Sequence, residues 1–183
     1  MKNPHKNIIF QTEWFDIEEE VYSGIDKLEN KPFYRILAPD GVIVLATTKD
    51  HKIVMVKQFR PALNKYTIEF PSGAIKPREK PISAAKRELL EETGYICKKY
   101  EPLLEGHVML SRFSSKDYAF WGQMAYRDIN IVKEKGIEVL LWNIEELKHH
   151  IIDGSFNHFA MISLISLAEW KFQTFQFNFS SRN

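Results

Sequence analysis

The sequence predicts an α/β protein of the α+β kind, in which helices pack on the faces of one mixed β-sheet. Two apolar, β-branched runs at residues 42–48 and 53–59 flank a short polar turn, which indicates a buried hairpin. A stretch with helical apolar spacing follows, and further strand-like and helix-like stretches come after it. Because 183 residues suffice for one domain with a sizeable core, we expect a single domain over residues 1–183.

The first part of the chain is expected to lie outside that core. The stretch "WFDIEEEVYSG" near the N-terminus predicts an additional strand. The turn "LAPDG" at residues 37–41 marks the boundary, because proline presets one backbone angle and Asp-Gly tolerates a tight bend. We therefore expect residues 1–40 to form an N-terminal strand extension and residues 41–183 to form the core. Within the core, "YTIEF" at residues 66–70 predicts a short strand.

The central helix has clear signals at both ends. Pro81 suits the first helical position, where the missing N–H is not needed. Gly94 suits the position just past the helix end. Ile82, Ala85 and Leu89 have the spacing of an apolar stripe that faces the core.

The second half of the chain predicts four more strands and two helices. The strands are expected at residues 95–100, 103–110, 118–126 and 138–142. The sequence "NIEE" predicts a capping box that opens a short helix, with Asn143 as the cap and Glu146 reaching back. The last helix is expected over residues 157–170, with Phe159, Ile162 and Ile165 facing inward. This order of strands, one helix, more strands and two helices is typical of a mixed sheet with helices on its faces.

Composition narrows the classes of partner. The formal net charge of +1 gives no overall field that would attract nucleic acid or an anionic membrane. No apolar run approaches the ~20 residues of a membrane span, and the first ten residues lack the apolar centre of a signal peptide. The single cysteine, Cys97, excludes an internal disulfide framework. We therefore expect a cytoplasmic protein that binds neither nucleic acid nor membrane.

Three glutamates crowd one side of the central helix, in the stretch "RELLEETG". At 100° per residue, Glu92 lies about 40° from Glu88 and Glu91 about 60° from it on the other side. Like charges at this spacing repel by roughly 0.2–0.5 kcal/mol per pair. A solvated acidic face is one interpretation. A divalent cation is the other, because Mg²⁺ binds oxygen ligands and usually takes one or two carboxylates plus substrate phosphates.

The spacing around these glutamates is specific. Five residues separate Gly73 from Glu79, and seven more lead to "RELLEETGY" at residues 87–95. This pattern resembles the Nudix box, G-x5-E-x7-R-E-U-x-E-E-x-G-U, where U is a bulky apolar residue. All seven fixed positions agree, and Tyr95 stands where an aliphatic residue is usual. The segment "VKQFRPALNKYTIEFPSG" before the box is similar to that of the ADP-ribose and nucleoside-diphosphate-sugar pyrophosphatases of this superfamily.

This resemblance implies a fold, an assembly and a set of roles. The family fold is an α/β/α sandwich, and this group usually forms a homodimer through its N-terminal strands. Implied metal ligands for Mg²⁺, or Mn²⁺ as the alternative, are the Ser72 carbonyl, Glu88 and Glu92. Implied catalytic or orienting positions are Glu91, Arg87 and Glu79, while Gly73 and Gly94 shape the loop and the helix end. Implied substrate contacts are Arg60 on the diphosphate, Glu69 near the terminal ribose or the metals, and Phe33 stacked on the base.

The chain departs from the group's pattern after the box. A proline is usual about sixteen residues past the box, where this chain has Ser111. The following loop usually carries a catalytic glutamate, near which Lys116 falls here. Asp117 is the closest carboxylate, and either replaces that glutamate or simply starts a strand. His107 lies in an apolar run, which favours a core histidine over a base. Lys76 and Arg78 make the box loop basic. This loop either contacts a further phosphate or is simply solvated.

The leading functional hypothesis is metal-dependent hydrolysis of the diphosphate linkage of a nucleoside diphosphate joined to a sugar or ribose. The products would be a nucleoside monophosphate and a sugar phosphate. One alternative keeps the box and changes the substrate to a nucleoside triphosphate, a dinucleoside polyphosphate or coenzyme A. Another is a weakly catalytic sensor of a nucleotide metabolite. The phenylalanine-rich end of the chain either packs on the chain's own surface or contacts a second subunit.

Overall fold

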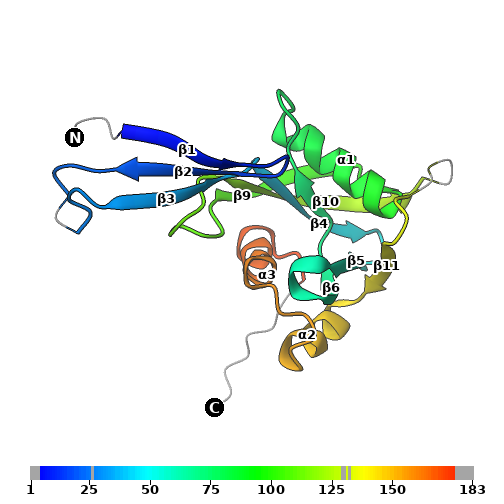
Figure 1. Ribbon diagram of the computed structural model, residues 1–183. Helices are drawn as coiled ribbons and strands as arrows, with labels where there is room; N and C mark the ends of the chain where they lie inside the picture. Colours follow the sequence, from blue (N-terminus) through cyan, green and yellow to red (C-terminus); the bar gives the residue numbers. More distant parts are fainter. Residues whose placement is uncertain (1–4, 26, 129–130, 132, 176–183) are drawn as a thin grey trace, which may run out of the picture.

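The computed structural model describes residues 5–25, 27–128, 131 and 133–175 (Figure 1). Its helices are the 3₁₀-helix η1 (Pro61–Leu63), α1 (Pro81–Thr93), α2 (Ile144–Ile152) and α3 (Phe159–Phe172). Its strands are β1 (His5–Gln11), β2 (Asp16–Val21), β3 (Pro32–Leu37), β4 (Gly41–Thr48), β5 (Ile53–Arg60), β6 (Lys65–Glu69), β7 (Ser72–Ala74), β8 (Tyr95–Ile96), β9 (Lys99–Gly106), β10 (Asp117–Arg127) and β11 (Glu138–Trp142).

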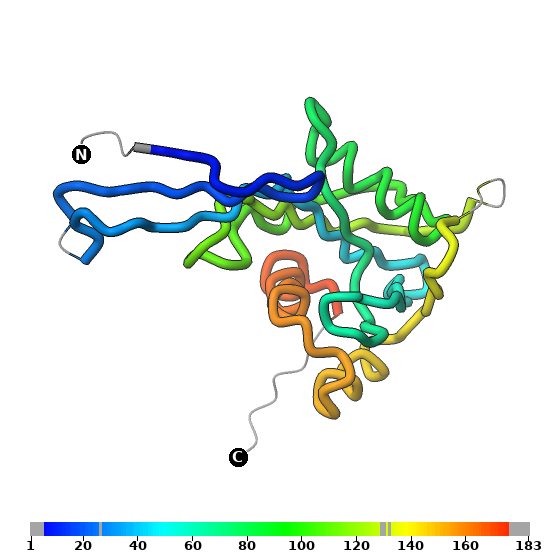
Figure 2. The backbone as a smooth tube through the Cα atoms, in the orientation of Figure 1, coloured from blue at the N-terminus to red at the C-terminus, as the bar shows by residue number. Residues whose placement is uncertain are grey.

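The strands form two sheets. The larger sheet has the order β11-β5-β4-β10-β8, with β6 paired to β5, β7 to β4 and β9 to β10. It is mixed, because β10 runs parallel to β4 while the other pairs are antiparallel. The predicted hairpin is therefore confirmed as β4 and β5. The smaller sheet, β1-β2-β3, is antiparallel and projects from the main body (Figures 1 and 2).

Helices cover both faces of the larger sheet, as Figure 1 shows. Alternate residues of β4 point to opposite faces, and all of those from Val42 to Ala46 are buried. Val42 and Val44 pack in a cluster with Leu89 of α1, while Ile43 and Leu45 belong to a cluster with residues of α2 and α3. The predicted α/β/α arrangement with a mixed sheet is thus confirmed.

The ends of the helices agree with the sequence signals. Pro81 occupies the first turn of α1, and Gly94 ends the helix with φ of 73°, a left-handed conformation that glycine adopts without strain. Asn143 and Glu146 form the capping box that opens α2. Each side chain accepts a hydrogen bond from the other residue's backbone N–H, at 2.8 and 2.6 Å. These signals are local, so tertiary packing had no reason to override them.

Two predictions about the second half were wrong in detail. The strand expected over residues 103–110 ends at Gly106, because the following residues leave the large sheet and run along β3. There the Ile36 N–H donates to the Arg112 carbonyl at 2.8 Å. Phe159 does not face inward but is 90% exposed. The buried stripe of α3 follows Met161, Leu164, Ile165 and Ala168 instead, and places Phe159 on another side of the helix.

The N-terminal sheet exposes apolar side chains and buries charged ones. Ile9, Phe10 and Trp14 are exposed. Glu20 is almost fully buried on β2, where Lys6 and Arg35 lie 2.8 Å from its Oε1. The Glu20 side chain is therefore charge-compensated within the small sheet.

The C-terminal end of the described chain packs on the core. There the Phe172 ring packs at a tilt against Trp121, with the ring centres 5.2 Å apart, and Phe175 packs on the core. Phe177 and Phe179, on which the two interpretations of this segment also depend, lie outside the described residues. None of the helices in the described part of the chain has the length and apolar character needed to cross a membrane.

Candidate active site

The box glycine and the box helix meet where β7 runs beside α1. Gly73 lies on β7, paired with Val42 of β4. A Cβ atom on Gly73 would lie 2.3–2.5 Å from the carboxyl atoms of Glu88. Real Cβ atoms do not approach other atoms that closely, so only glycine lets the Glu88 carboxylate reach the backbone of this strand.

Arg87 holds most of the acidic residues together. Its Nε and Nη2 donate to the two carboxylate oxygens of Glu79 at 2.9 and 2.8 Å, a bidentate pair. Its Nη1 donates to Glu88 at 2.5 Å and to Glu91 at 3.1 Å, and its Nη2 also reaches the Ala74 carbonyl at 2.9 Å. The Arg87 guanidinium holds the pKa of Glu79 at about 2. One cation therefore orients three box glutamates and the backbone of the glycine loop.

Glu92 and Glu88 lie in a partly enclosed place, where Arg87 pairs with Glu88 and no cation pairs directly with Glu92 among the ion pairs of the described residues. Glu92 is 5% exposed, and its Oε2 accepts a hydrogen bond from the Ser72 N–H at 3.0 Å. Burial raises the pKa of Glu92 to about 8, and the neighbouring Glu88 adds to the rise. Burial also raises the pKa of Glu88, against the influence of Arg87. Both carboxylates would be stabilised as anions by a cation.

The donor set fits a hard divalent ion. Two carboxylates and the Ser72 carbonyl supply only oxygen, which Mg²⁺ and Mn²⁺ accept, and substrate phosphates normally complete such a site. Among the residues that the structure describes, no group of three or more His, Cys, Asp or Glu side chains is arranged to hold an ion. A set of two side chains and one carbonyl is smaller than such a group and would need substrate oxygens to complete the coordination of an ion.

Arg60 and Glu69 form a second ion pair between β5 and β6. The Nε and Nη2 of Arg60 donate to the Glu69 carboxylate at 2.7 and 2.6 Å, and the Thr67 hydroxyl donates to it at 2.6 Å. Burial acts to raise the pKa of Glu69, but these hydrogen bonds outweigh it and hold the pKa below its usual range. The Arg60 guanidinium also acts on Glu92, whose pKa it lowers. Arg60, which the sequence predicts to contact the diphosphate, is therefore already paired with Glu69 in the structure.

Asp117 lies at the same corner of the sheet as the glycine loop. It starts β10, directly beside Gly41 in the parallel pairing with β4. A Cβ on Gly41 would lie 2.4 Å from Asp117 Oδ1 and 3.7 Å from the Gly73 carbonyl oxygen. Burial raises the pKa of Asp117, with a further contribution from Asp40. Gly41 was missed as a site residue, because the "PDG" sequence signals only a turn.

The neighbours of Asp117 have other roles. Lys116 is partly exposed and pairs with Glu105 at 2.6 Å, so the position near which the usual loop glutamate falls holds a cation here. The prediction that His107 is a core residue was wrong: the strand ends before it and the ring is exposed. Its Nδ1 lies 2.9 Å from the Ser115 carbonyl oxygen. His158, which caps α3, was not singled out from the sequence, yet in its protonated form it acts to lower the pKa of both Asp117 and Glu69.

Phe33 lies on β3, in the N-terminal sheet. The guanidinium carbon of Arg112 lies 4.3 Å from the centre of its ring, and Tyr22 meets it edge-on at 6.1 Å. One face of Phe33 is therefore covered by a cation. Lys76 and Arg78 of the box loop are both exposed, and the Lys76 N–H donates to Glu79 at 3.0 Å.

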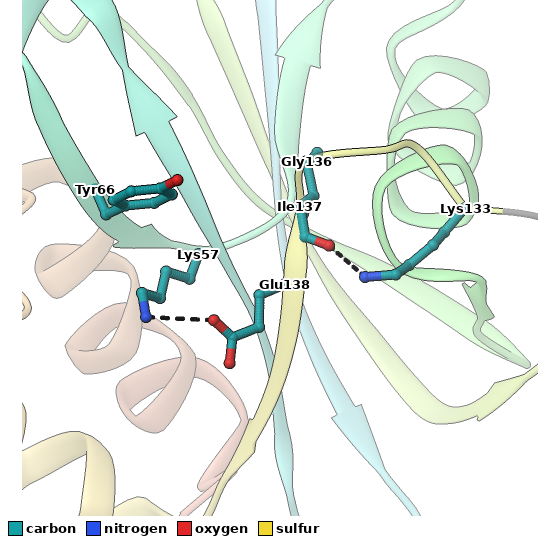
Figure 3. Close-up of a pocket in the computed structure, with 6 residues that line it drawn as sticks. All are labelled: Lys57, Tyr66, Lys133, Gly136, Ile137 and Glu138. Carbon is teal, nitrogen blue, oxygen red and sulfur yellow. Dashed lines mark hydrogen bonds and ion pairs between the residues drawn. The ribbon is translucent and has the colours of Figure 1, made fainter.

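Two hollows of similar size differ in their relation to these carboxylates. One, of about 560 Å³, is lined by Lys57, Tyr66 and Glu138 among others (Figure 3). Its lysines are already engaged, since Lys57 pairs with Glu138 at 3.3 Å and Lys133 donates to the Ile137 carbonyl. It contains none of the predicted site residues. The other, of about 500 Å³, includes Asp117 in its wall. The chemistry of the site therefore points to the second hollow.

Comparison with known families agrees with this geometry. A family model described as the NUDIX domain matches residues 37–177, so the chain belongs to the Nudix domain family. The resemblance noted from the box is thereby confirmed. The match begins at the end of β3, and the rest of the N-terminal sheet precedes it.

Two curated relatives and one solved structure are similar to this chain. The ADP-ribose pyrophosphatase of Bacillus subtilis (strain 168) is 51% identical over 61 residues, which cover 33% of each chain. The methanol dehydrogenase activator of Bacillus methanolicus is 47% identical over 66 residues, which cover 36% of each chain. The chain thus aligns with only about a third of the length of these relatives. The crystal structure of an ADP compounds hydrolase superposes with a TM-score of 0.77, at 20% identity, over 94% of this chain and 96% of that chain, which shows the shared fold.

Proposed function

We propose that this protein hydrolyses the diphosphate linkage of a nucleoside diphosphate joined to a sugar or ribose, and releases a nucleoside monophosphate and a sugar phosphate. One observation carries the proposal: Glu88 and Glu92 lie beside the glycine strand, half-buried to buried, with Arg87 arranging the acidic residues around them. The names of its relatives, an ADP-ribose pyrophosphatase and an ADP compounds hydrolase, are consistent with this substrate class.

The proposed cofactor is Mg²⁺, with Mn²⁺ as the alternative, held by Glu88, Glu92 and the Ser72 carbonyl. Such an ion supplies neutralisation of the phosphate oxygens and a lowered pKa for the attacking water. The protein's part is to hold the two carboxylates in place. Gly73 leaves room for Glu88, and the Ser72 N–H holds one oxygen of Glu92.

The remaining box residues are proposed to position or assist. Arg87 and Glu79 form the bidentate pair that fixes the orientation of Glu88 and Glu91. Glu91, which is exposed, is proposed to face the substrate side and polarise water. Asp117 is proposed to accept the proton of the attacking water, in place of the glutamate that is usual in the loop. Its raised pKa makes it a stronger base than an exposed aspartate.

Substrate contacts are proposed for Arg60, Glu69 and Phe33. In Arg60, Nη1 makes neither of the two bonds to Glu69, so a phosphate oxygen can approach that nitrogen without breaking the ion pair. Glu69 holds the Arg60 side chain in this orientation and lies near Glu92. Phe33 is proposed to stack on the base through the ring face that Arg112 does not cover.

We also propose that the chain is one domain that pairs with a second copy through its N-terminal sheet. Support comes from the apolar side chains that β1 and the following turn expose, including Ile9, Phe10 and Trp14. The cytoplasmic location stays a prediction from the sequence. So do the two alternatives for the phenylalanine-rich C-terminal segment, which either packs on the chain's own surface or contacts a second subunit.

A kinetic assay tests the proposed function. The full chain would be incubated with Mg²⁺ and ADP-ribose, ADP-glucose, GDP-mannose or UDP-glucose, and nucleoside monophosphate release would be measured by chromatography. We expect monophosphate with at least one compound, and none when EDTA replaces the metal. Release of inorganic phosphate or diphosphate from a nucleoside triphosphate, with no turnover of the four diphosphate compounds, would contradict the proposal.

A further inference from the structure

The hollow that contains Asp117 has a largely apolar lining. It has a volume of about 500 Å³ and lies between β9, the start of β10 and the first turns of α3. Leu104, Val108, Met109, Phe159 and Leu164 supply much of its wall. Phe159 and Met109 are 90% and 49% exposed, so apolar surface is open to whatever enters. A volume of this size suits a ligand of nucleoside dimensions.

The few polar groups of the hollow accept hydrogen bonds. Asp117 contributes a carboxylate. The Nδ1 of His107 faces the Ser115 carbonyl oxygen at 2.9 Å, and must carry a proton to bond to it, so Nε2 is the acceptor when the ring is neutral. The Ser163 hydroxyl already donates to the Ala160 carbonyl at 2.7 Å. No lysine or arginine occurs among the described residues that line the hollow.

This chemistry selects among the groups that a nucleoside diphosphate can carry. A terminal phosphate needs a cation, and the described lining offers none. A sugar with many hydroxyls needs an array of polar partners, whereas most of this wall is apolar. A flat heterocycle has apolar faces for Phe159 and Met109 and N–H groups at its edge for the acceptors. It is the group that this lining matches.

We propose that the hollow binds a second nucleobase, so that the preferred substrate is a nucleoside diphosphate joined to another nucleoside. The inference rests on the proposed function and narrows its substrate class. Asp117 links the hollow to the glycine loop of the box. It lines the hollow, and a Cβ atom on Gly41 would lie close both to Asp117 Oδ1 and to the Gly73 carbonyl oxygen. A diphosphate held at the carboxylates therefore directs one end of the substrate into the hollow, where its base stacks on Phe159.

Two compounds that differ by one base test the proposal. Diadenosine diphosphate is ADP-ribose with an adenine added on the terminal ribose, so the ratio of their kcat/KM values reports the second base alone. We expect wild-type protein to favour the dinucleotide by ~10-fold or more, the effect of one stacked base. Phe159→Ala is expected to remove ~10-fold from kcat/KM for the dinucleotide, through KM, and less than ~2-fold from that for ADP-ribose. Trp170→Ala, an exposed aromatic of the same helix outside the hollow, is the matched control and should change neither value.

Equal kcat/KM values for the two compounds would overturn the inference. An equal loss for both compounds in Phe159→Ala would also overturn it, since the shared adenosine would then occupy the hollow. If neither compound is hydrolysed with Mg²⁺, the proposed function fails and calorimetry with adenosine decides the inference separately. Binding by the wild type that is at least ~10-fold weaker in Phe159→Ala supports the hollow as a base site, and no binding, or binding that is unchanged in the variant, overturns it.

Discussion

The guanidinium carbon of Arg112 lies 4.3 Å from the centre of the Phe33 ring, and this contact joins the N-terminal sheet to the loop that leads to Asp117. Arg112 Nη1 also donates to the Tyr34 carbonyl at 3.1 Å. The Ile36 N–H donates to the Arg112 carbonyl at 2.8 Å. Residues 107–116 thus run beside β3 (Figure 2), and the small sheet supports one wall of the hollow beside Asp117.

The first prediction concerns this contact. Arg112→Ala should lower kcat/KM by ~2–5-fold, the effect of one lost cation–π contact, because the loop loses its side-chain contact with Phe33 while its backbone bond to Ile36 and the core stay intact. The free energy of unfolding should change little, since an exposed cation–π contact is worth ~0.5–1 kcal/mol. Steady-state kinetics and urea unfolding check the two values. Lys148→Ala removes an exposed cation that pairs only within α2, and serves as the control. Unchanged kinetics in Arg112→Ala would show that the backbone bonds to β3 hold the loop without the Arg112 side chain.

The second prediction concerns the acidic cluster. Glu92→Gln should lower kcat by ~100-fold or more, because a metal contributes several kcal/mol of charge stabilisation and each ~1.4 kcal/mol is tenfold in rate. Glutamine keeps the volume and can still accept from the Ser72 N–H, so the fold should be retained. The rate of nucleoside monophosphate release and circular dichroism check this. Glu145→Gln, on the exposed side of α2, should retain wild-type rates. Wild-type turnover in Glu92→Gln would rule out the metal role.

The third prediction follows from the pKa of Glu92, which burial raises from 4.5 to about 8 in the metal-free fold. Between these two pH values the folded state binds the Glu92 proton more tightly than the unfolded chain does. The free energy of unfolding therefore falls as pH rises through that window, and this contribution is fully present only below about pH 4.5. In Glu92→Gln this dependence is absent. From pH 5 to pH 8, the free energy of unfolding of the variant should therefore rise by ~2 kcal/mol relative to that of the wild type.

Urea unfolding in EDTA at the two pH values measures this difference. Groups far from Glu92 contribute equally to both proteins, so the gap between variant and wild type reports Glu92 together with its coupling to neighbours such as Glu88. With Mg²⁺ in excess the order should reverse, because an ion that binds only the folded wild type stabilises it. A gap that is the same at pH 5 and pH 8 in EDTA would mean that Glu92 titrates normally.

Local signals in the sequence predicted the local parts of this structure. The ends of α1 at Pro81 and Gly94 and the cap of α2 at Asn143 depend on neighbouring residues, so the sequence carries them directly. The resemblance to the box implied orienting positions at Arg87 and Glu79, and these two side chains form an ion pair in the structure. Contacts made by distant segments were not predictable in this way. The parallel pairing of β4 with β10 is what brings Gly41 to Asp117, and no periodicity within either strand encodes it.

The same limit explains the errors on α3 and on the loop after β9. Phe159 has the spacing of a core residue relative to Ile162, but the face of α3 that meets the sheet is decided by packing against β4 and β9. Residues after Gly106 are apolar enough for a strand, yet they follow β3 rather than the large sheet. Phe159 and Met109 are apolar residues that the fold leaves exposed, and both line the hollow. Such exposed apolar residues therefore help to locate a binding site.

The last prediction concerns Gly41, whose missing side chain leaves room for Asp117. A Cβ there would lie 2.4 Å from Asp117 Oδ1, so Gly41→Ala must displace the carboxylate. We expect Gly41→Ala to lower kcat/KM about as much as Asp117→Ala, by ~100-fold for a lost general base. The double variant should be no worse than either single one, because both changes remove the same group from its position. Kinetics on the four proteins of this cycle measure the coupling. Additive losses would show that Gly41 acts on the site by a route other than Asp117.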